Sequence, residues 1–367
     1  MKFTCKREQL QNGINIVSKA VSGRTTLPIL ECILLTVSNE GFKLTANNLE
    51  LGIETAIMEA DVYETGIIAI ESKLFSEIIR RVNGEFVSIE TDGKNIAHIS
   101  SGFSDFKITI QEGDDFPMLP AVEKNNEYIL YQNDLKNMIR QTIFSIAQDE
   151  SKPVLTGELL ELSLNSMNMV SVDGYRISYR KCNLVKGNDD ISVIVPGKTL
   201  NEISKILSTE NEDTVSIYVT EKHILFDLGQ SIVVSRLIEG EYIKYKQSFT
   251  EDFKTRIFVN RSELIASLER ASLISRDSKK IPVKLDINQS KIVINSNAEL
   301  GTAHEEMDIE CDGDGLKIAF NPRYLIDALK AIDEDKVSIQ FTASLSPCII
   351  KPFEGDEYKY LILPLRM

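Results

Sequence analysis

Apolar residues recur at three- and four-residue steps in six stretches of the chain. In residues 196–207 the apolar positions are Leu200, Ile203, Ile206 and Leu207, which would form one stripe along a short helix. Five other stretches repeat the pattern, and their starts are about 60 residues apart, the length of a helix plus a small sheet. Helices are therefore predicted at Arg7–Val21, Glu71–Val82, Gln132–Ala147, Pro196–Leu207, Asn260–Ser275 and Asn321–Ile332.

Three short segments rich in Val, Ile, Leu and Thr follow each predicted helix, with turn residues between them. After the first helix they are Leu30–Val37, Gly41–Ala46 and Leu51–Met58, and one further strand, Met1–Cys5, opens the chain. The tripeptide Val-Ser-Ile begins the strand after every second helix, at residues 87–89, 215–217 and 337–339. One tripeptide at the same phase in three places indicates a threefold internal duplication.

The duplication predicts three similar domains, at residues 1–121, 122–250 and 251–367. A chain of 367 residues is too long for one ordinary core, and the pattern lapses at Glu112–Pro120 and Glu239–Asp252. Two prolines in the first of these segments could not serve inside a sheet. The predicted class is α+β, with two helices packed on antiparallel sheets in each domain.

Charge is divided unevenly between the helices and the rest of the chain. The six helical stretches, with the first extended to Lys6–Arg24 and the fifth to Arg276, hold 16 Lys and Arg against 8 Asp and Glu. They carry +8 in a chain of net charge −14, so the remainder carries −22. If the helices share one side, the protein has a basic face that suits weak, sequence-blind contact with phosphates. The alternative is that these Lys and Arg side chains only keep the exposed helix faces solvated and contact no phosphate. The basic residues in question are Arg24, Lys73, Arg80, Arg81, Lys136, Arg140, Lys198, Lys205, Arg270, Arg276, Arg323 and Lys330.

No other pattern points clearly to chemistry. The five cysteines are scattered without C-x-x-C spacing, and His98, His223 and His304 stand alone in strand-like segments, so no metal or cofactor is predicted. Nucleophile and nucleotide-binding motifs are absent. The acidic pairs at residues 114–115 and 189–190 leave open a hydrolase or transferase built on a repeat scaffold. Without an apolar run of membrane-spanning length or a leader pattern, the protein is expected in the cytoplasm, away from membranes.

Several motifs together resemble one family, the bacterial DNA polymerase III beta subunits, which are processivity sliding clamps. The resemblance covers the whole chain. It rests on the threefold repeat and on four motifs: DFPxxP at residues 115–120, DGYR at 173–176, NPRY at 321–324 and LPLRM at 363–367.

This resemblance implies a non-catalytic ring that encircles duplex DNA without reading its sequence. The ring would be a head-to-tail homodimer of six similar domains, with helices lining the hole and sheets forming the rim. It would tether the replicative polymerase, the clamp loader and repair proteins through their short clamp-binding peptides. A monomeric scaffold is the remaining alternative.

The resemblance also implies two sets of site residues. A peptide pocket between the second and third domains would involve Leu155, Asp173, Gly174, Tyr175, Arg176, Ile177, Ile243, Tyr324, Leu345, Leu361, Ile362, Leu363, Pro364, Leu365, Arg366 and Met367. The subunit contact would involve Phe106, Leu273 and Ile274.

Overall fold

Four antiparallel sheets form the framework of the protein, and every strand pair among the described residues is antiparallel. The structure is a computed structural model that describes residues 1–23, 25–39, 41–57, 59–93, 95–149, 151–275 and 282–366. The chain divides into two compact units, Met1–Gln132 with Glu202–Leu237, and Asn133–Asn201 with Ile238–Met367. Since this division falls inside the second predicted domain, the boundaries at residues 121 and 250 stay predictions.

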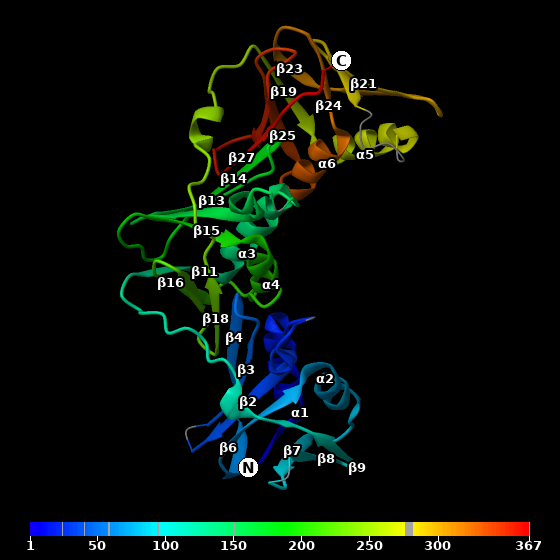
Figure 1. Ribbon diagram of the computed structural model, residues 1–367. Helices are drawn as coiled ribbons and strands as arrows, with labels where there is room; N and C mark the ends of the chain where they lie inside the picture. The colour runs from blue at the N-terminus through cyan, green and yellow to red at the C-terminus, as the bar shows by residue number, and fades with distance from the viewer. Residues whose placement is uncertain are drawn as a thin grey trace. The chain divides into compact units, whose positions relative to one another are not determined.

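The first unit holds one sheet of five strands and one of nine (Figure 1). The five-stranded sheet runs in the order β5 (Ala60–Glu64), β1 (Lys2–Lys6), β7 (Phe86–Thr91), β8 (Ile96–Ser101), β9 (Ser104–Thr109). The nine-stranded sheet runs β10 (Gln111–Glu112), β6 (Gly66–Glu71), β2 (Cys32–Ser38), β3 (Gly41–Asn47), β4 (Leu51–Ile57), β18 (Ser231–Arg236), β17 (His223–Asp227), β16 (Thr214–Val219), β11 (Glu127–Tyr131).

The second unit holds one sheet of nine strands and one of four. The nine-stranded sheet runs β15 (Ile191–Pro196), β12 (Gly157–Leu162), β13 (Ser166–Val172), β14 (Arg176–Asn183), β27 (Tyr358–Ile362), β26 (Cys348–Pro352), β25 (Lys336–Phe341), β19 (Thr255–Asn260), β23 (Glu310–Gly313). The four-stranded sheet runs β22 (Gly301–Asp308), β21 (Lys291–Ala298), β20 (Val283–Ile287), β24 (Leu316–Phe320).

Helices occupy all six predicted stretches. They are α1 (Arg7–Val17), α2 (Ser72–Arg81), α3 (Gln132–Thr142), α4 (Gly197–Ser204), α5 (Arg261–Ser272) and α6 (Pro322–Ala331). Several end earlier than predicted, because α1, α3 and α5 pass into single 3₁₀ turns at Ser18–Ala20, Ile143–Ser145 and Leu273–Ser275. None of the described helices has the length and apolar character of a membrane span.

A strand leads into every one of these helices, which the sequence analysis recognised only for the first. Strands β6, β11, β15 and β19 end at the residue before their helix, and β24 ends one residue earlier. Each of these strands has five or six residues, and its helix follows at once or after one residue. The repeated unit is therefore strand, helix and three strands, and the three Val-Ser-Ile tripeptides fall in the equivalent strands β7, β16 and β25.

The predicted apolar stripe of α1 is buried and packs on β3 and β4. Leu10, Ile14 and Val17 are at most 1% exposed, and α1 lies beside α2 (Figure 1). Gly13 allows the close approach, since a Cβ there would stand 2.7 Å from Ile57 Cδ1. The equivalent pair in the second unit, α5 and α6, also lies side by side.

Asparagine caps hold the starts of the last two helices. The side chain of Asn260 accepts a hydrogen bond from the backbone N–H of Glu263 at 3.1 Å, and that of Asn321 accepts one from Arg323 N–H at 3.1 Å. Pro322 occupies the first turn of α6, where no backbone donor is needed. These caps fix where α5 and α6 begin, and the start of α6 borders the site described next.

Candidate functional site

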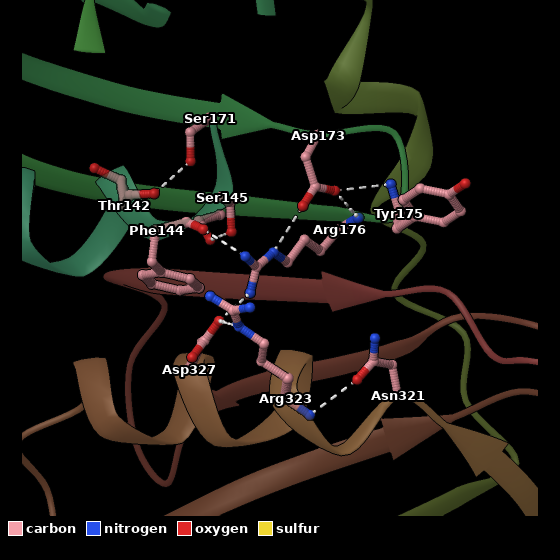
Figure 2. Close-up of polar contacts among 11 residues, drawn as sticks. Thr142, Phe144, Ser145, Ser171, Asp173, Tyr175, Arg176, Asn321, Arg323 and Asp327 are labelled. Atoms are coloured by element: carbon pink, nitrogen blue, oxygen red, sulfur yellow. Dashed lines mark hydrogen bonds and ion pairs between the residues drawn. The ribbon is translucent and has the colours of Figure 1, made fainter. Parts of the chain in front are cut away.

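A buried arginine, Arg176, is the centre of the polar contacts in the second unit. Its side chain is 9% exposed, and its guanidinium reaches three separate elements (Figure 2). Nε donates to Asp173 Oδ2 at 2.9 Å, Nη1 donates to Asp327 Oδ2 at 2.8 Å, and Nη2 donates to the carbonyl oxygen of Phe144. A buried charge needs such partners, because an unpaired one costs several kcal/mol. Arg176 thus ties the start of β14 to α6 and to the 3₁₀ turn after α3.

The turn between β13 and β14 presents Tyr175 to solvent. Asp173 Oδ1 accepts hydrogen bonds from the backbone N–H groups of Tyr175 at 2.9 Å and Arg176 at 3.1 Å (Figure 2). Gly174 has φ of +91°, a backbone conformation that residues other than glycine rarely adopt. The Asp-Gly pair of the DGYR motif therefore sets the turn, and Tyr175 at its tip is 57% exposed.

Aromatic rings enclose the guanidinium and extend the surface toward Tyr175. The ring centroids of Tyr324 and Phe144 lie 4.6 and 5.3 Å from Arg176 Cζ, within cation–π range. The rings of Tyr175 and Tyr324 stack with their centroids 6.1 Å apart. Burial, helped by the charge of Asp173, raises the pKa of the Tyr324 hydroxyl. The site thus combines two stacked tyrosine rings with a buried, paired charge.

A groove of about 1020 Å³, hereafter the Arg176 groove, opens beside these residues. Its walls combine the apolar side chains of Ile143, Phe144 and Ile146 with the carboxylates of Asp173 and Asp327. An apolar wall with a few fixed polar groups can cover the apolar surface of a ligand and fix its orientation.

The structure brings some predicted pocket residues into this groove and places others around it. Asp173, Tyr175, Arg176 and Tyr324 line it. The others do not line it. Gly174 is in the turn, Ile362 is in the core of the last repeat, and one apolar cluster contains Leu155, Ile177 and Leu361. Ile243 and Leu345 are exposed, the C-terminal segment consists of Leu363, Pro364, Leu365 and Arg366, and Met367 is outside the described residues. Hydrogen bonds hold that segment in place, from Leu363 N–H to Tyr175 O and from Leu365 N–H to Ala319 O.

Two residues that organise the groove were missed by the sequence analysis. Phe144 and Asp327 lie in predicted helical stretches, where a phenylalanine and an aspartate have ordinary structural roles. Asp327 meets Arg176 across 151 residues of sequence, so no local pattern could have indicated the pair.

Six of the twelve predicted DNA-facing cations are paired with carboxylates. The ion pairs are Arg81–Glu77 (3.5 Å), Arg140–Asp333 (2.5 Å), Lys205–Glu202 (2.7 Å), Arg270–Glu305 (2.5 Å), Lys330–Glu269 (2.6 Å) and the longer Arg323–Asp327 (3.8 Å). Within the described ranges, Lys73, Arg80 and Lys198 have no carboxylate partner. Arg24 and Arg276 fall outside the described residues, and Lys136 lies on α3.

The predicted subunit-contact residues lie near two free sheet edges. Phe106, 36% exposed, is on β9, the edge strand of the five-stranded sheet. Leu273, 49% exposed, and Ile274 belong to the 3₁₀ turn beside β22, the edge strand of the four-stranded sheet.

None of the acidic residues considered as catalytic candidates lines the Arg176 groove. Asp114 and Asp115 are in the 3₁₀ turn Gly113–Asp115, and Asp189 and Asp190 are in the loop between β14 and β15. Among the residues that the structure describes, no three His, Cys, Asp or Glu side chains gather as metal ligands would.

Tandem repeats of two helices on shared antiparallel sheets, with basic helices and a peptide-sized groove, define a class of DNA clamp. Comparison with known protein families makes this specific. Models of the DNA polymerase III beta subunit match the chain three times: the N-terminal domain at residues 1–120, the central domain at 129–244 and the C-terminal domain at 246–366.

Individual relatives match over the full length. Beta sliding clamps of Staphylococcus epidermidis and Staphylococcus aureus are each 34% identical, with 100% of this chain and 99% of the relative covered. A solved structure of a putative DNA polymerase III beta subunit from Eubacterium rectale is 44% identical, with a TM-score of 0.96 and complete coverage of both chains. The DNA polymerase sliding clamp from Bacillus subtilis is 32% identical, with a TM-score of 0.96 and coverage of 100% and 99%.

The chain belongs to the DNA polymerase III beta subunit family, the beta sliding clamps. It has the clamp fold and acts as a DNA sliding clamp in replication, a processivity factor without catalytic activity of its own. The family implies DNA, a DNA polymerase and a second clamp subunit as partners.

Proposed function

We propose that two copies of this chain close head to tail into a ring, and that the ring surrounds duplex DNA. The main support for this proposal is that each sheet continues from one repeat into another. The third strand after α1 pairs with the third strand after α4 (β4 with β18), and the third after α3 pairs with the third after α6 (β14 with β27). The third strands after α5 and α2, namely β22 and β9, are edge strands with no such partner among the described residues.

These two edges complement each other. Pairing β9 of one copy with β22 of another would join five strands to four and give a sheet of nine, the size of both continuous sheets. Lys107 on β9 would face a strand that carries Glu305 and Glu306, and Phe106 would cover the apolar surface near Leu273. A heterologous contact of this kind gives a closed ring when the rotation that relates the two subunits returns to the starting copy. Closure also pairs the two open sheet edges.

Duplex DNA fits the hole of this ring on electrostatic grounds. The helices that carry +8 would face the DNA, and the −22 elsewhere would repel it from the outside. Such a ring holds DNA by topology, so it raises the polymerase's effective concentration at the template without gripping any sequence. We place this action in the cytoplasm, where a bacterial chromosome lies.

Retention on DNA of different topology tests the ring. The protein is loaded onto nicked circular duplex, and one half of the sample is then linearised with a restriction enzyme. We expect retention on the circle and rapid loss from the linear molecule, because a ring slides off a free end. Equal retention on both would refute encirclement. Sedimentation at micromolar concentration separates the dimer from a monomeric scaffold.

We also propose that the Arg176 groove and the C-terminal segment bind the short peptides of the polymerase, the clamp loader and repair proteins. Support comes from Tyr175, which is exposed and stacks on the half-buried Tyr324 in the groove, and from the exposed Leu363, whose backbone N–H donates to Tyr175 O. Aromatic anchors beside a few fixed polar groups are typical of surfaces that bind peptide side chains.

Removal of Leu363–Met367 tests this site. The deletion takes away the hydrogen bond from Leu363 N–H to Tyr175 O and the apolar side chains of the segment, so binding of a labelled polymerase peptide should be lost while the dimer persists. Leu345→Ala should weaken peptide binding, and Leu164→Ala, an equally exposed leucine between β12 and β13, should not. Unchanged peptide affinity after the deletion would exclude the site.

A further inference from the structure

The two joints where a sheet continues from one repeat into the next have the same register. At the first joint, Ile53 of β4 lies opposite Val233 of β18. At the second, Ser178 of β14 lies opposite Tyr360 of β27. Since these residues hold equivalent places in their repeats, as the next two paragraphs establish, they also give the register of a joint between β22 of one copy and β9 of another.

The counterpart of Val233 and Tyr360 on β9 is Phe106. In each repeat the isoleucine of Val-Ser-Ile pairs with a residue of the next strand, which pairs in turn with the strand at the joint. These successive pairs join Ile89 to Ile99 and Phe106, Ile217 to Phe226 and Val233, and Ile339 to Ile350 and Tyr360.

The counterpart of Ile53 and Ser178 on β22 is Ala303. The residue two places before α2, α4 and α6 pairs with residue 33, 158 or 283 of the neighbouring strand. From there the same path, two residues forward and then across to the paired strand, is taken twice. It leads to Ile53, Ser178 and Ala303.

This correspondence places Asp105 of one copy opposite His304 of the other. When Phe106 pairs with Ala303 in antiparallel strands, the residue before Phe106 meets the residue after Ala303. Directly opposite residues point to the same face, with their Cβ atoms about 4.5–5.5 Å apart. Asp105 and His304 are both exposed in the single chain, so neither side chain is covered before the subunits join.

The surroundings of His304 in the single chain suit a positive charge. Its Nδ1 lies 2.9 Å from Asn295 Oδ1, and its Nε2 lies 3.1 Å from Glu306 Oε1. Both neighbours are acceptor oxygens, and only a doubly protonated imidazole donates to two of them.

Two acidic residues of β22 follow His304, and cations engage both. Lys291 pairs with Glu306 at 3.2 Å, and hydrogen bonds from His304 and Lys291 hold the pKa of Glu306 below its usual range. Glu305 points to the other face of the strand, where α5 packs, and pairs with Arg270 at 2.5 Å. In the single chain, therefore, protonated His304 shares the carboxylate of Glu306 with a lysine.

The partner's β9 would add a second carboxylate. Asp105 lies directly opposite His304 in this register, on the face where the imidazole lies. Lys107 would lie diagonal to His304, at about 7–8 Å, and its long side chain can turn away into solvent. His98 pairs with Lys107 within the partner's sheet, one strand farther from the joint. Asp105 is thus the nearest charge that closure brings to His304.

We propose that His304 of one copy and Asp105 of its partner form an ion pair across each subunit contact, so that the ring closes more tightly at low pH. The inference rests on the proposed ring and adds what regulates its closure. An imidazole gains its charge as the pH falls from about 8 to 5, whereas carboxylates stay ionised there. The closed ring therefore binds more protons than two separate subunits, and its dissociation constant rises with pH.

The dissociation constant of the dimer at pH 6 and pH 8 tests the ion pair. Opposite charges on facing strands are worth about 1.5- to fivefold in affinity, so the two contacts of the ring should give about two- to 25-fold tighter association at pH 6. Dissociation is followed by dilution of fluorescently labelled subunits at constant ionic strength.

Three variants locate the effect. His304→Gln and Asp105→Asn should each remove the pH dependence, and His223→Gln, on β17 inside a sheet, should keep it. Equal dissociation constants of the unchanged protein at both pH values would overturn the proposal, and so would a pH dependence that survives in either of the first two variants. Urea midpoints equal to that of the unchanged protein verify that each variant is folded.

Cross-linking tests the register separately from titration. The Cα atoms of directly opposite residues lie about 4.5–5.5 Å apart, within the range of a disulfide. Under mild oxidation, Asp105→Cys with His304→Cys should give a covalent dimer on a denaturing gel, and neither single substitution should. Asp105→Cys with Glu306→Cys, two residues farther along β22, is the control; a covalent dimer from this pair instead would overturn the register.

Two results separate failure of the ion pair from failure of the ring. A protein that is monomeric at micromolar concentration at both pH values has no subunit contact, and the proposed ring fails with the ion pair. A dimer that cross-links through residues 105 and 304 but dissociates equally at both pH values keeps the ring and refutes the ion pair.

Discussion

Glu158 is a buried carboxylic acid whose titration should be visible in the stability of the protein. It lies on β12, is 0% exposed, and both of its carboxyl oxygens lack a hydrogen-bond partner among the described residues. Burial raises its pKa from 4.5 to about 8, and the neighbouring Thr142 hydroxyl offsets only part of this, since it donates to Met138 O at 2.7 Å. Glu158 is therefore neutral in the folded protein near pH 7.

The direction of the pH effect follows from this raised pKa. In the unfolded chain the acid ionises around pH 4.5, but in the folded chain it keeps its proton until about pH 8. The stability that Glu158 contributes is thus fully present below pH 4.5 and is lost as the pH rises through 8. With about 1.4 kcal/mol per pKa unit, the loss between pH 5 and pH 7.5 is about 3 kcal/mol.

Glu158→Gln removes this titration and keeps the shape of the side chain. The variant's free energy of unfolding, relative to the unchanged protein, should increase by about 3 kcal/mol from pH 5 to pH 7.5 in urea titrations. Glu161→Gln on the same strand is the control. Burial acts against the ionised Glu161, but hydrogen bonds from Tyr245, Lys246 and Asn168 outweigh it and hold its pKa below the usual range. For Glu161→Gln, the free energy of unfolding relative to the unchanged protein should stay constant from pH 5 to pH 7.5. If this difference were constant for Glu158→Gln as well, the reasoning would be refuted.

Three other substitutions probe the Arg176 groove, the subunit contact and the DNA-facing cations. Arg176→Met leaves two carboxylates without their cation, so we expect a loss of about 3 to 5 kcal/mol in urea unfolding together with weaker peptide binding; a stable variant with normal peptide affinity would contradict the central role of Arg176. Phe106→Asp should convert the dimer to a monomer in sedimentation, whereas Phe86→Asp, exposed on β7, should leave it dimeric. Glu305→Gln frees Arg270 and should steepen the salt dependence of duplex binding by up to about 0.9; an unchanged slope would mean that Arg270 meets no phosphate.

The four predicted residues that line the Arg176 groove, Asp173, Tyr175, Arg176 and Tyr324, belong to two short motifs whose turns and caps form locally. The Asp173-Gly174 turn and the Asn321 cap each depend on contacts within three residues, and both stand in the sequence as recognisable motifs. What joins them is not local. Asp327 and Phe144 reach Arg176 from distant segments, and nothing in their own neighbourhoods marks them as its partners.

The ion pairs of the basic residues were not predictable from the sequence either. The sequence identifies twelve basic residues on helical stretches, and by sequence alone they are equivalent. Only the fold decides that Arg270 meets Glu305, 35 residues away, while Lys73 and Arg80 have no carboxylate partner in the part of the chain that the structure describes.

By itself, the sequence determined the six helices, the threefold repeat and the family, because hydrophobic periodicity and motifs are recorded residue by residue along the chain. The tertiary structure decided which strands join the repeats, which edges are left open and which charges are neutralised. Those outcomes depend on which distant segments pack together, and hydrogen-bond donors, acceptors and charges find their partners only after that packing is fixed.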